Sequence, residues 1–371
     1  MIHHDARPYA VAVSEAAESF KKKLEEQIHG SVERVERVIE QVQNDVPEDA
    51  VVKSATLRFG VAAERDLVVA VNGAERTIHK HALAQLADRA QVKQLRSVVN
   101  DLTAVGGNAG SAWRRELVAH MLNEIYRHEE GKRFLLRTVR GELRGFLSDQ
   151  YRRLDSRPLL DAFVSVMQKF GARPVDGFAL ETKMRVRAIL PMVFEPFPGE
   201  IMAFGAELGD SDFGDGALSL RGFVQRMWCT NLATTEDVLT KVHLGKRLDD
   251  IRLSQGTYEL DTKAMASAVN DLASHVLGAP AINGYIDMVK TANEQKIEPS
   301  QITTWVKKNL QKDEGKKAID KFNSPDIELL PAGQTSWRWS NALSWLANET
   351  SDERRKLELQ DMAGSVLQKT A

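Results

Sequence analysis

The sequence predicts an α+β protein, in which a small twisted antiparallel sheet with a packed helix is flanked by helical regions at both ends. Three observations predict this class. Apolar residues recur every three or four positions over 14–43, as in a long amphipathic helix. From about 132 to 229 the apolar runs have the length and alternation of strands, and one helical run interrupts them at 156–171. After Asn231 the pattern becomes helical again, so strand pair, helix and strand meander follow one another as in α+β folds.

Turn and cap residues delimit the elements. The first helix ends at Asn44-Asp45, before Pro47. Asn72-Gly73 predicts a hairpin between strands at 67–71 and 74–78. Ser156 caps the later helix, and Pro158 stands in its first turn. The other predicted elements are helices at 80–104 and 112–130, a hairpin at 132–148, strands at 183–190, 199–208 and 217–229, and C-terminal helices interrupted by a charged linker at 311–326.

These elements group into three regions, which suits a chain of 371 residues. Residues 1–131 form a mainly helical N-terminal region with a small hairpin. Residues 132–235 form the α+β core, which includes a basic strand face. Residues 236–371 form a helical C-terminal region.

Composition excludes several classes of protein. The chain has 50 basic and 52 acidic residues, with 43% apolar and 27% charged side chains, which is ordinary for a soluble globular protein and unlike a histone. No apolar run is long enough to cross a membrane, and the first residues do not read as a secretion signal. The single cysteine, Cys229, excludes an internal disulfide and a thiolate-rich zinc site. We therefore expect a cytoplasmic protein.

A basic segment carries the strongest functional signal. Residues 132–187 contain thirteen basic and six acidic side chains. In the strand at 183–190, Lys183, Arg185 and Arg187 alternate with apolar residues, so they share one face. Three cations in a row on an open face suit a phosphate backbone, and a nearby tyrosine suits base stacking. The predicted nucleic-acid-binding residues are Arg133, Arg137, Arg140, Arg144, Tyr151, Arg152, Arg153, Lys183, Arg185 and Arg187. The competing interpretation is a sheet face whose arginines are paired with the acidic segment 195–215.

That acidic segment supports a second function. Its carboxylates at Glu207, Asp210, Asp212 and Asp215 are of the type that holds magnesium or manganese for phosphodiester chemistry. The same residues also suit a polar hairpin tip. A metal-dependent nuclease is therefore the enzymatic alternative.

Other candidate motifs are weaker. His120, Glu124 and His128 would share a helix face, either as metal ligands or as a solvated stripe. The glycine-rich loop 106–110 lacks the lysine and hydroxyl residue of a phosphate-binding loop. Three tryptophans, Trp337, Trp339 and Trp345, lie close together in the sequence and are expected mainly to anchor a terminal helix to the body.

Two stretches around the strands carry a family resemblance. The matching residues are Ser148, Asp149, Tyr151 and Arg152 in the first stretch, and Ser211, Asp212, Gly214, Arg226, Cys229, Thr230 and Asn231 in the second. In this order they resemble the phage/plasmid-like family of unknown function that includes the YfjQ and YafZ proteins, although Leu232 replaces the family's usual glycine. The architecture is also similar in outline to annealing proteins of the RecT/Redβ/Erf kind. The resemblance implies a role in the recombination or replication of a phage or plasmid in a bacterial host.

We therefore expect a non-enzymatic protein that binds and anneals single-stranded DNA, with no cofactor, metal or nucleotide. The helix at 14–43 carries an apolar stripe that predicts a homo-oligomer through this segment. The core at 132–235 is expected to fold without it. A phage exonuclease or a host protein is a further expected partner, and a host-binding or inhibitory protein is the third functional hypothesis.

Overall fold

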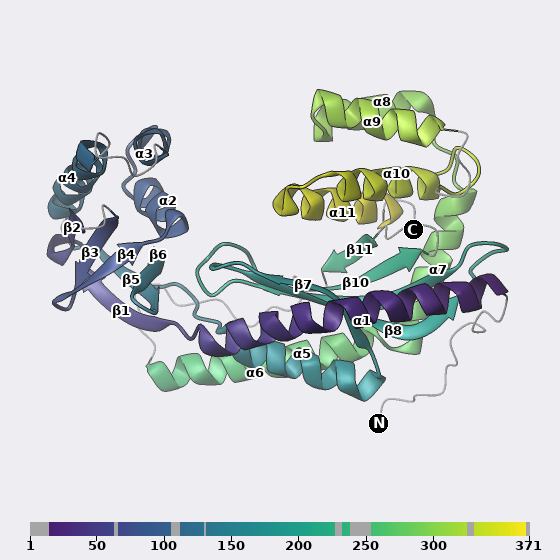
Figure 1. The fold of residues 1–371 in the computed structure, drawn as a ribbon, viewed down its shortest axis with the longest axis horizontal. Helices are drawn as coiled ribbons and strands as arrows, with labels where there is room; N and C mark the ends of the chain where they lie inside the picture. The colour runs from purple at the N-terminus through teal and green to yellow at the C-terminus, as the bar shows by residue number, and fades with distance from the viewer. Residues whose placement is uncertain are drawn as a thin grey trace.

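Two β-sheets with helices packed on them organise the chain, which confirms the predicted α+β class. The computed structural model describes residues 15–62, 66–104, 112–129, 131–226, 232–237, 254–324 and 330–368. These residues form three parts, each with its own apolar cluster: an N-terminal arm, a base and a C-terminal arm (Figure 1).

The N-terminal arm, residues 48–148, is built on a six-stranded sheet of order β1-β5-β6-β4-β3-β2. Only β4 and β6 pair in parallel. Helices pack on the sheet and bury Leu86, Leu122 and Tyr126 among its aromatic side chains, where Tyr126 contacts Phe134 and Phe146 edge to face. The elements are β1 (Glu48–Lys53), the short 3-10 turn η1 (Ser54–Thr56), β2 (Arg58–Val61), β3 (Leu67–Val71), β4 (Ala74–Ile78), α2 (Lys80–Arg89), α3 (Leu95–Thr103), α4 (Ala112–His128), β5 (Arg133–Val139) and β6 (Glu142–Ser148).

The strand pairing corrects the predicted division of the chain at 131/132. The hairpin β5–β6 exists as predicted, but it pairs with β1 and β4 of the N-terminal region and not with the later strands. Its apolar residues, such as Phe134 and Phe146, are covered by helices that precede them in the chain. Alternation within a hairpin predicts its strands but not the sheet in which it is placed.

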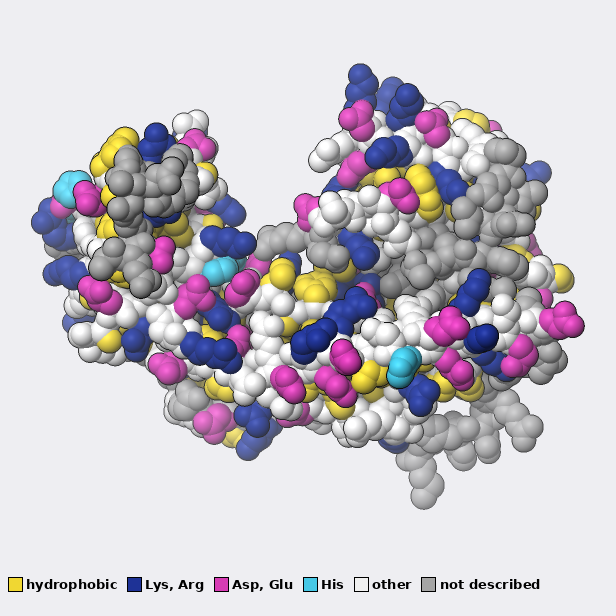
Figure 2. Space-filling view, in the orientation of Figure 1, with side chains coloured by type: hydrophobic (Ala, Val, Ile, Leu, Met, Phe, Trp, Pro, Cys, Tyr) yellow, Lys and Arg dark blue, Asp and Glu magenta, His cyan; other side chains and the backbone are white. Residues whose placement is uncertain are grey.

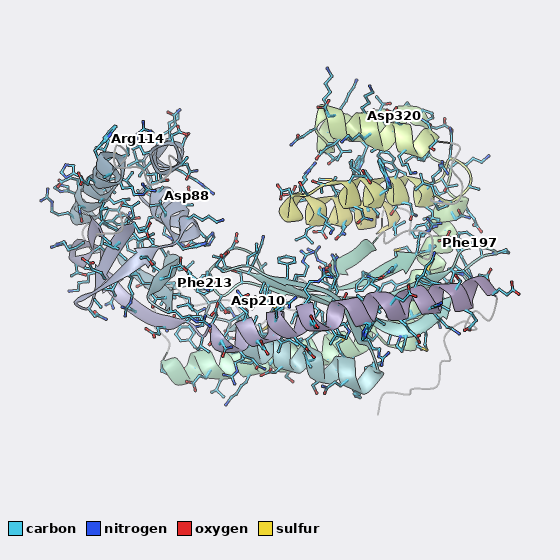
Figure 3. All side chains as sticks on the ribbon, viewed as in Figure 1. Asp88, Arg114, Phe197, Asp210, Phe213 and Asp320 are labelled. Atoms are coloured by element: carbon cyan, nitrogen blue, oxygen red, sulfur yellow. The ribbon has the colours of Figure 1, made fainter. Side chains whose placement is uncertain are left out.

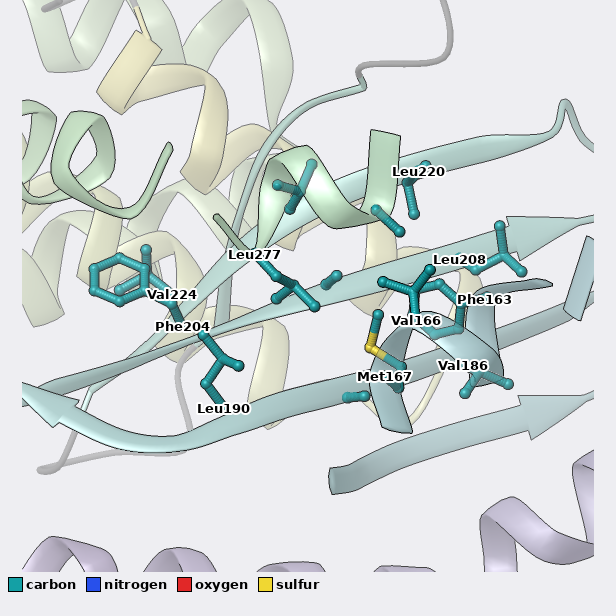
Figure 4. Close-up of a cluster of buried hydrophobic side chains, with 14 of the residues drawn as sticks. Phe163, Val166, Met167, Val186, Leu190, Phe204, Leu208, Leu220, Val224 and Leu277 are labelled. Atoms are coloured by element: carbon teal, nitrogen blue, oxygen red, sulfur yellow. The ribbon is translucent and has the colours of Figure 1, made fainter. Parts of the chain in front are cut away.

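The base is built on a five-stranded antiparallel sheet of order β11-β10-β9-β8-β7. One sheet face packs on α5 and α6, where Phe163, Val166 and Met167 lie against Val186 and other strand residues (Figure 4). The elements are α1 (Glu15–Asn44), α5 (Ser156–Phe170), β7 (Arg173–Ala179), β8 (Met184–Phe194), β9 (Met202–Asp210), β10 (Ser219–Arg226), β11 (Leu232–Asp237), α6 (Gln255–Val276) and α7 (Ala279–Glu294).

Helix α1 packs on the opposite face of this sheet, and this corrects the predicted assembly. Phe20 and Leu24 are each 2% exposed and lie with Ile28 against the strand residues Ile189 and Phe223. The apolar stripe is therefore covered within its own chain, so it gives no reason for subunits to associate through residues 14–43. It also means that removing the helix would uncover the sheet, contrary to the expectation of an independently folded core.

The C-terminal arm is a helical unit of α8 (Pro299–Asn309), α9 (Lys312–Asn323), α10 (Ser336–Glu349) and α11 (Glu353–Gln368). As predicted, the tryptophans anchor its helices: Trp337 and Trp339 are each 1% exposed, and Trp339 contacts Trp305 and Phe322 edge to face.

The predicted linker at 311–326 is wrong, because 312–323 is helix α9. A capping box formed by Gln311 and Glu314 begins this helix, and Ala318 and Phe322, one turn apart, attach it to the arm. Together with the half-buried Ile319, they form a short apolar stripe that seats a helix whose composition is otherwise charged.

The two arms rise from the same side of the base and leave an open gap between them (Figures 1 and 2). Among the described residues, no helix is both long and apolar enough to cross a membrane.

We expect Leu24→Ala to lower the free energy of unfolding by about 2–5 kcal/mol, because it leaves a cavity between α1 and the sheet. Urea unfolding followed by circular dichroism measures this loss. Leu260→Ala is the matched control, since Leu260 is 67% exposed and its loss should change stability by less than about 0.5 kcal/mol. Equal losses in the two variants would contradict the seating of α1.

Candidate nucleic-acid interface

The basic strand face predicted at 183–190 exists in β8, but it is not open. Arg185 and Arg187 lie on the face opposite Met184 and Val186, as the alternation predicts. However, the Arg187 side chain is 2% exposed and that of Arg185 is 15% exposed. Both guanidinium groups turn to Glu207 of the neighbouring strand β9, so the competing interpretation of a paired face is correct for these two residues.

Glu207 is the centre of this network. Its fully buried carboxylate accepts a hydrogen bond from Arg187 Nε and lies 3.1 Å from Arg185 Nη1. Arg187 also donates to Gln360 of α11 at 2.7 Å and lies 3.5 Å from Asp176 of β7. Gly205 and Gly209 lie on either side of Glu207 on the same face of β9. A Cβ atom at Gly209 would come within 2.9 Å of Ser219 Oγ, so there is little room for a side chain at this position.

Burial and the neighbouring charges together set the pKa values of Glu207 and Arg185. Burial raises the pKa of the Glu207 carboxyl, but Arg187 and Arg185 outweigh this effect, so its pKa lies below the usual value. Burial lowers the pKa of Arg185, and the nearby negative charge of Glu207 offsets part of this decrease. The contact between Arg185 Nη1 and Glu207 Oε1 lacks hydrogen-bond geometry, so this guanidinium nitrogen is buried without an acceptor.

Two further ion pairs on this face were not predicted from the sequence. Arg34 of α1 lies 3.3 Å from Asp176, and Arg221 of β10 lies 2.5 Å from Asp361 of α11. We call the whole set the floor network: Arg34, Asp176, Arg185, Arg187, Glu207, Arg221 and Asp361. The alternation of β10 would have placed Arg221 on the same face as Arg185, but nothing in the sequence relates Arg34 to either. Figure 2 shows Lys and Arg side chains gathered on the floor of the gap.

Two other predicted DNA contacts, Arg137 and Arg144, instead join the N-terminal arm to the base. Arg137 is 2% exposed and donates to Asp49 at 2.8 Å, to Asp155 and to the backbone carbonyl of Asp212 at 2.8 Å. Arg144 is 9% exposed and donates to Asp45 and Glu142, each at 2.8 Å. Their guanidinium groups are thus occupied by partners from within the chain, and neither is available for phosphates.

The remaining predicted residues do not form one surface. Arg152 makes a two-pronged pair with Asp261 of α6, at 2.6 and 2.7 Å. Arg153 lies 3.2 Å from Asp49 and stacks over the ring of Tyr258.

Tyr151 lies beside the 211–215 loop, and burial raises the pKa of its phenol to about 12. Arg133 and Lys183 are half-buried, and Arg140 is 66% exposed in the β5–β6 turn. Lys183 immediately precedes Met184 of β8, near the floor network.

The four acidic candidates go to three separate places, which removes the ligand set expected for a nuclease. Glu207 belongs to the floor network, and Asp215 accepts a hydrogen bond from Thr182 at 2.7 Å. Only Asp210 and Asp212 converge. Within the part of the chain that the structure describes, no group of three or more His, Cys, Asp or Glu could hold a metal ion.

The histidines predicted to share a helix face do not form a metal site either. The His128 side chain is 76% exposed beside Glu124, which indicates a solvated stripe. Cys229, Thr230, Asn231 and the loop 106–110 lie outside the described residues.

Asp210 and Asp212 meet at the hydroxyl of Ser156, in the first turn of α5. Ser156 Oγ lies 2.9 Å from Asp210 Oδ2 and 2.9 Å from Asp212 Oδ1, and the Ser156 amide donates to Asp212 at 2.7 Å. Asp155, not the predicted Ser156, occupies the N-cap position. Burial and the neighbouring Asp212 raise the pKa of Asp210 to about 7, and burial also raises the pKa of Asp212.

No protein-family model matches the chain, and the searches of curated proteins and of solved structures return no match either. The site is therefore interpreted from its own chemistry. It offers a floor with four guanidinium groups and three carboxylates, set between two arms.

We expect Arg187→Met to lower the free energy of unfolding by about 3–5 kcal/mol at neutral pH, because it leaves Glu207 buried with one weakly aligned partner. The lowered pKa of Glu207 means that its pairing stabilises the native state above the pKa of the unfolded carboxyl and is lost as the pH falls through the native value. The difference between variant and wild type should therefore shrink in acid.

Denaturant unfolding across a pH series measures this difference. Arg37→Met is the control, since the Arg37 side chain is 71% exposed and its contact with Glu33 is 4.0 Å long. A loss for Arg187→Met no larger than that control would show that the buried pair does not contribute to stability.

Proposed function

We propose that the chain binds single-stranded DNA in the gap between its two arms, with Lys183 and three arginines of the floor network, Arg34, Arg185 and Arg221, contacting phosphates. One observation carries the proposal: the four guanidinium groups of the floor network share three carboxylates, and the Arg34 side chain remains 54% exposed. A phosphate would supply the balancing negative charge and accept from the exposed guanidinium donors, and charged hydrogen bonds to phosphate are among the strong ones.

The proposal uses a smaller set of residues than the sequence predicted. Arg137, Arg144 and Arg187 are excluded as direct contacts because they are buried in internal pairs. Arg34 and Arg221 join the set, since their side chains are 54% and 22% exposed on the same floor. Long-range attraction at the floor would be modest, because three carboxylates lie among the four arginines, so we expect binding at low salt that weakens steeply as salt rises.

Annealing remains part of the proposal. Pairing of two complementary strands is downhill once phosphate repulsion is screened, so a strand-binding protein needs neither a metal nor a nucleotide for it. Binding and annealing are measured in the same experiment by using labelled complementary oligonucleotides.

We expect Arg34→Gln to weaken binding to a labelled single-stranded oligonucleotide several-fold at low salt. The slope of log affinity against log salt should decrease by roughly 0.7, the value for one lost phosphate contact on a single strand. Adding Lys183→Gln should lower affinity and slope further. Fluorescence anisotropy across a salt series measures both quantities.

Arg157→Gln is the matched control, because Arg157 is an exposed arginine on α5, which packs on the opposite face of the sheet. It should bind as the wild type does. A wild-type slope near zero, no binding at low salt, or equal weakening by Arg34→Gln and Arg157→Gln would each contradict the proposal.

A further inference from the structure

The joint between the N-terminal arm and the base is polar, and one loop carries much of it. The arm and the base have separate apolar clusters. The 211–215 loop, which follows β9 of the base, reaches the arm at the position of Phe213 (Figure 3). The carbonyl of Phe213 lies 3.1 Å from His81 Nε2 and accepts a hydrogen bond from Gln85 at 2.9 Å, both in α2.

The third hydrogen bond between this loop and the arm comes from Arg137 of β5, which donates to the Asp212 carbonyl. These three contacts all end on consecutive backbone carbonyls, those of Asp212 and Phe213. The position of this short stretch of loop therefore decides whether all three contacts with the arm can form.

The same loop is held to the base by the carboxyl pair at Ser156. A serine hydroxyl has one hydrogen, so it can donate to only one of the two carboxylates that lie 2.9 Å away. The second contact is a hydrogen bond only if the other carboxyl is protonated and donates to Ser156 Oγ. Each carboxyl also accepts a hydrogen bond from a backbone amide, Asp212 from Ser156 and Asp210 from Ser211. The positive charge of Arg137 lies closer to Asp212, so Asp210 is the group that carries the proton.

The charges around the pair also favour a retained proton. Asp49, Asp155, Asp210 and Asp212 face one another across the joint, with Arg137 and Arg153 among them, while Arg144 beside them is already paired with Asp45. Among the described residues, other titratable groups around the loop and pair are Tyr151, His81 and Asp215 on the loop side, Lys183 and Glu181 at the start of β8, and Asp45 after α1. A cavity of about 30 Å³, lined by Ser156, Asp212 and Lys183 among others, is large enough for water to exchange the proton.

We propose that this joint is a proton-operated latch: Asp210 and Asp212 share one proton while the arm is seated, and loss of that proton displaces the 211–215 loop and loosens the arm. The Arg137–Asp155 and Arg144–Asp45 pairs still tether the loosened arm to the base. With both carboxyls ionised, two like charges face each other across one serine hydroxyl, which can donate to only one of them. The loop moves to separate the charges, and the carbonyls of Asp212 and Phe213 leave Arg137, His81 and Gln85. This inference does not rest on DNA binding.

The sign of the effect follows from the raised pKa of Asp210, to about 7. The native state holds the proton more tightly than the unfolded chain, so the joint is most stable in mild acid and weakens as the pH rises through about 7. Asp210→Asn should remove this dependence, because a neutral amide can donate to Ser156 Oγ as the protonated carboxyl does.

The test measures the distance from the arm to the base in the full chain by double electron–electron resonance. Spin labels are placed on cysteines at the exposed positions Lys93 and Lys169, with Cys229→Ser so that no other thiol is labelled. The wild type should give one narrow distance distribution at pH 5.5 and a broader, shifted one at pH 8.5. Asp210→Asn should keep the narrow distribution at both pH values.

Asp88→Asn, on the exposed surface of α2, is the matched control and should respond to pH as the wild type does. Identical wild-type distributions at the two pH values, or a shift in Asp210→Asn as large as that of the wild type, would overturn the latch. Infrared difference spectroscopy tests the proton on the wild-type chain alone, so the proposal can be judged even if the variant does not fold. A protonated carboxyl band should titrate away near pH 7, and its absence between pH 6 and 8 would also overturn the proposal.

Discussion

The pairing of buried arginines with carboxylates is the constraint on which the arrangement of this molecule depends. A guanidinium group removed from water without partners costs several kcal/mol, so each buried arginine needs acceptors of good geometry. Arg137 and Arg144 find theirs across the joint between the N-terminal arm and the base. Arg187 finds them in β9 and in α11 of the C-terminal arm. The placement of both arms is therefore tied to the satisfaction of a few buried charges.

This constraint also determines which cations can meet a ligand. Buried arginines whose donors all have acceptors gain nothing from binding a phosphate, whereas Arg34 and Arg221, at the edge of the floor network, retain exposed surface. A sequence rich in arginine thus contains two populations with different roles. One holds the parts of the molecule together, and the other faces the gap between the arms.

At the carboxyl pair beside Ser156, buried negative charge is neutralised by a proton instead of by an arginine. The arginines near the pair are already shared with Asp49 and Asp155, so a proton supplies the remaining neutralisation. A proton, unlike an arginine, is exchanged with solvent near neutral pH. The joint therefore combines arginine–carboxylate pairs, which stay charged near neutral pH, with one carboxyl pair whose charge depends on the pH.

Local periodicity by itself determined the class of fold and the sides of the elements. The long first helix, the β5–β6 hairpin and the alternation of Met184 to Arg187 in β8 follow from side-chain spacing, which the backbone geometry of helices and strands makes readable. Only the tertiary structure decided what each face meets. The apolar stripe of α1 covers its own sheet, β5 and β6 join strands from the N-terminal region, and Arg137 meets Asp49, 88 positions away. Such partners are set by packing between distant segments, and no local pattern encodes them.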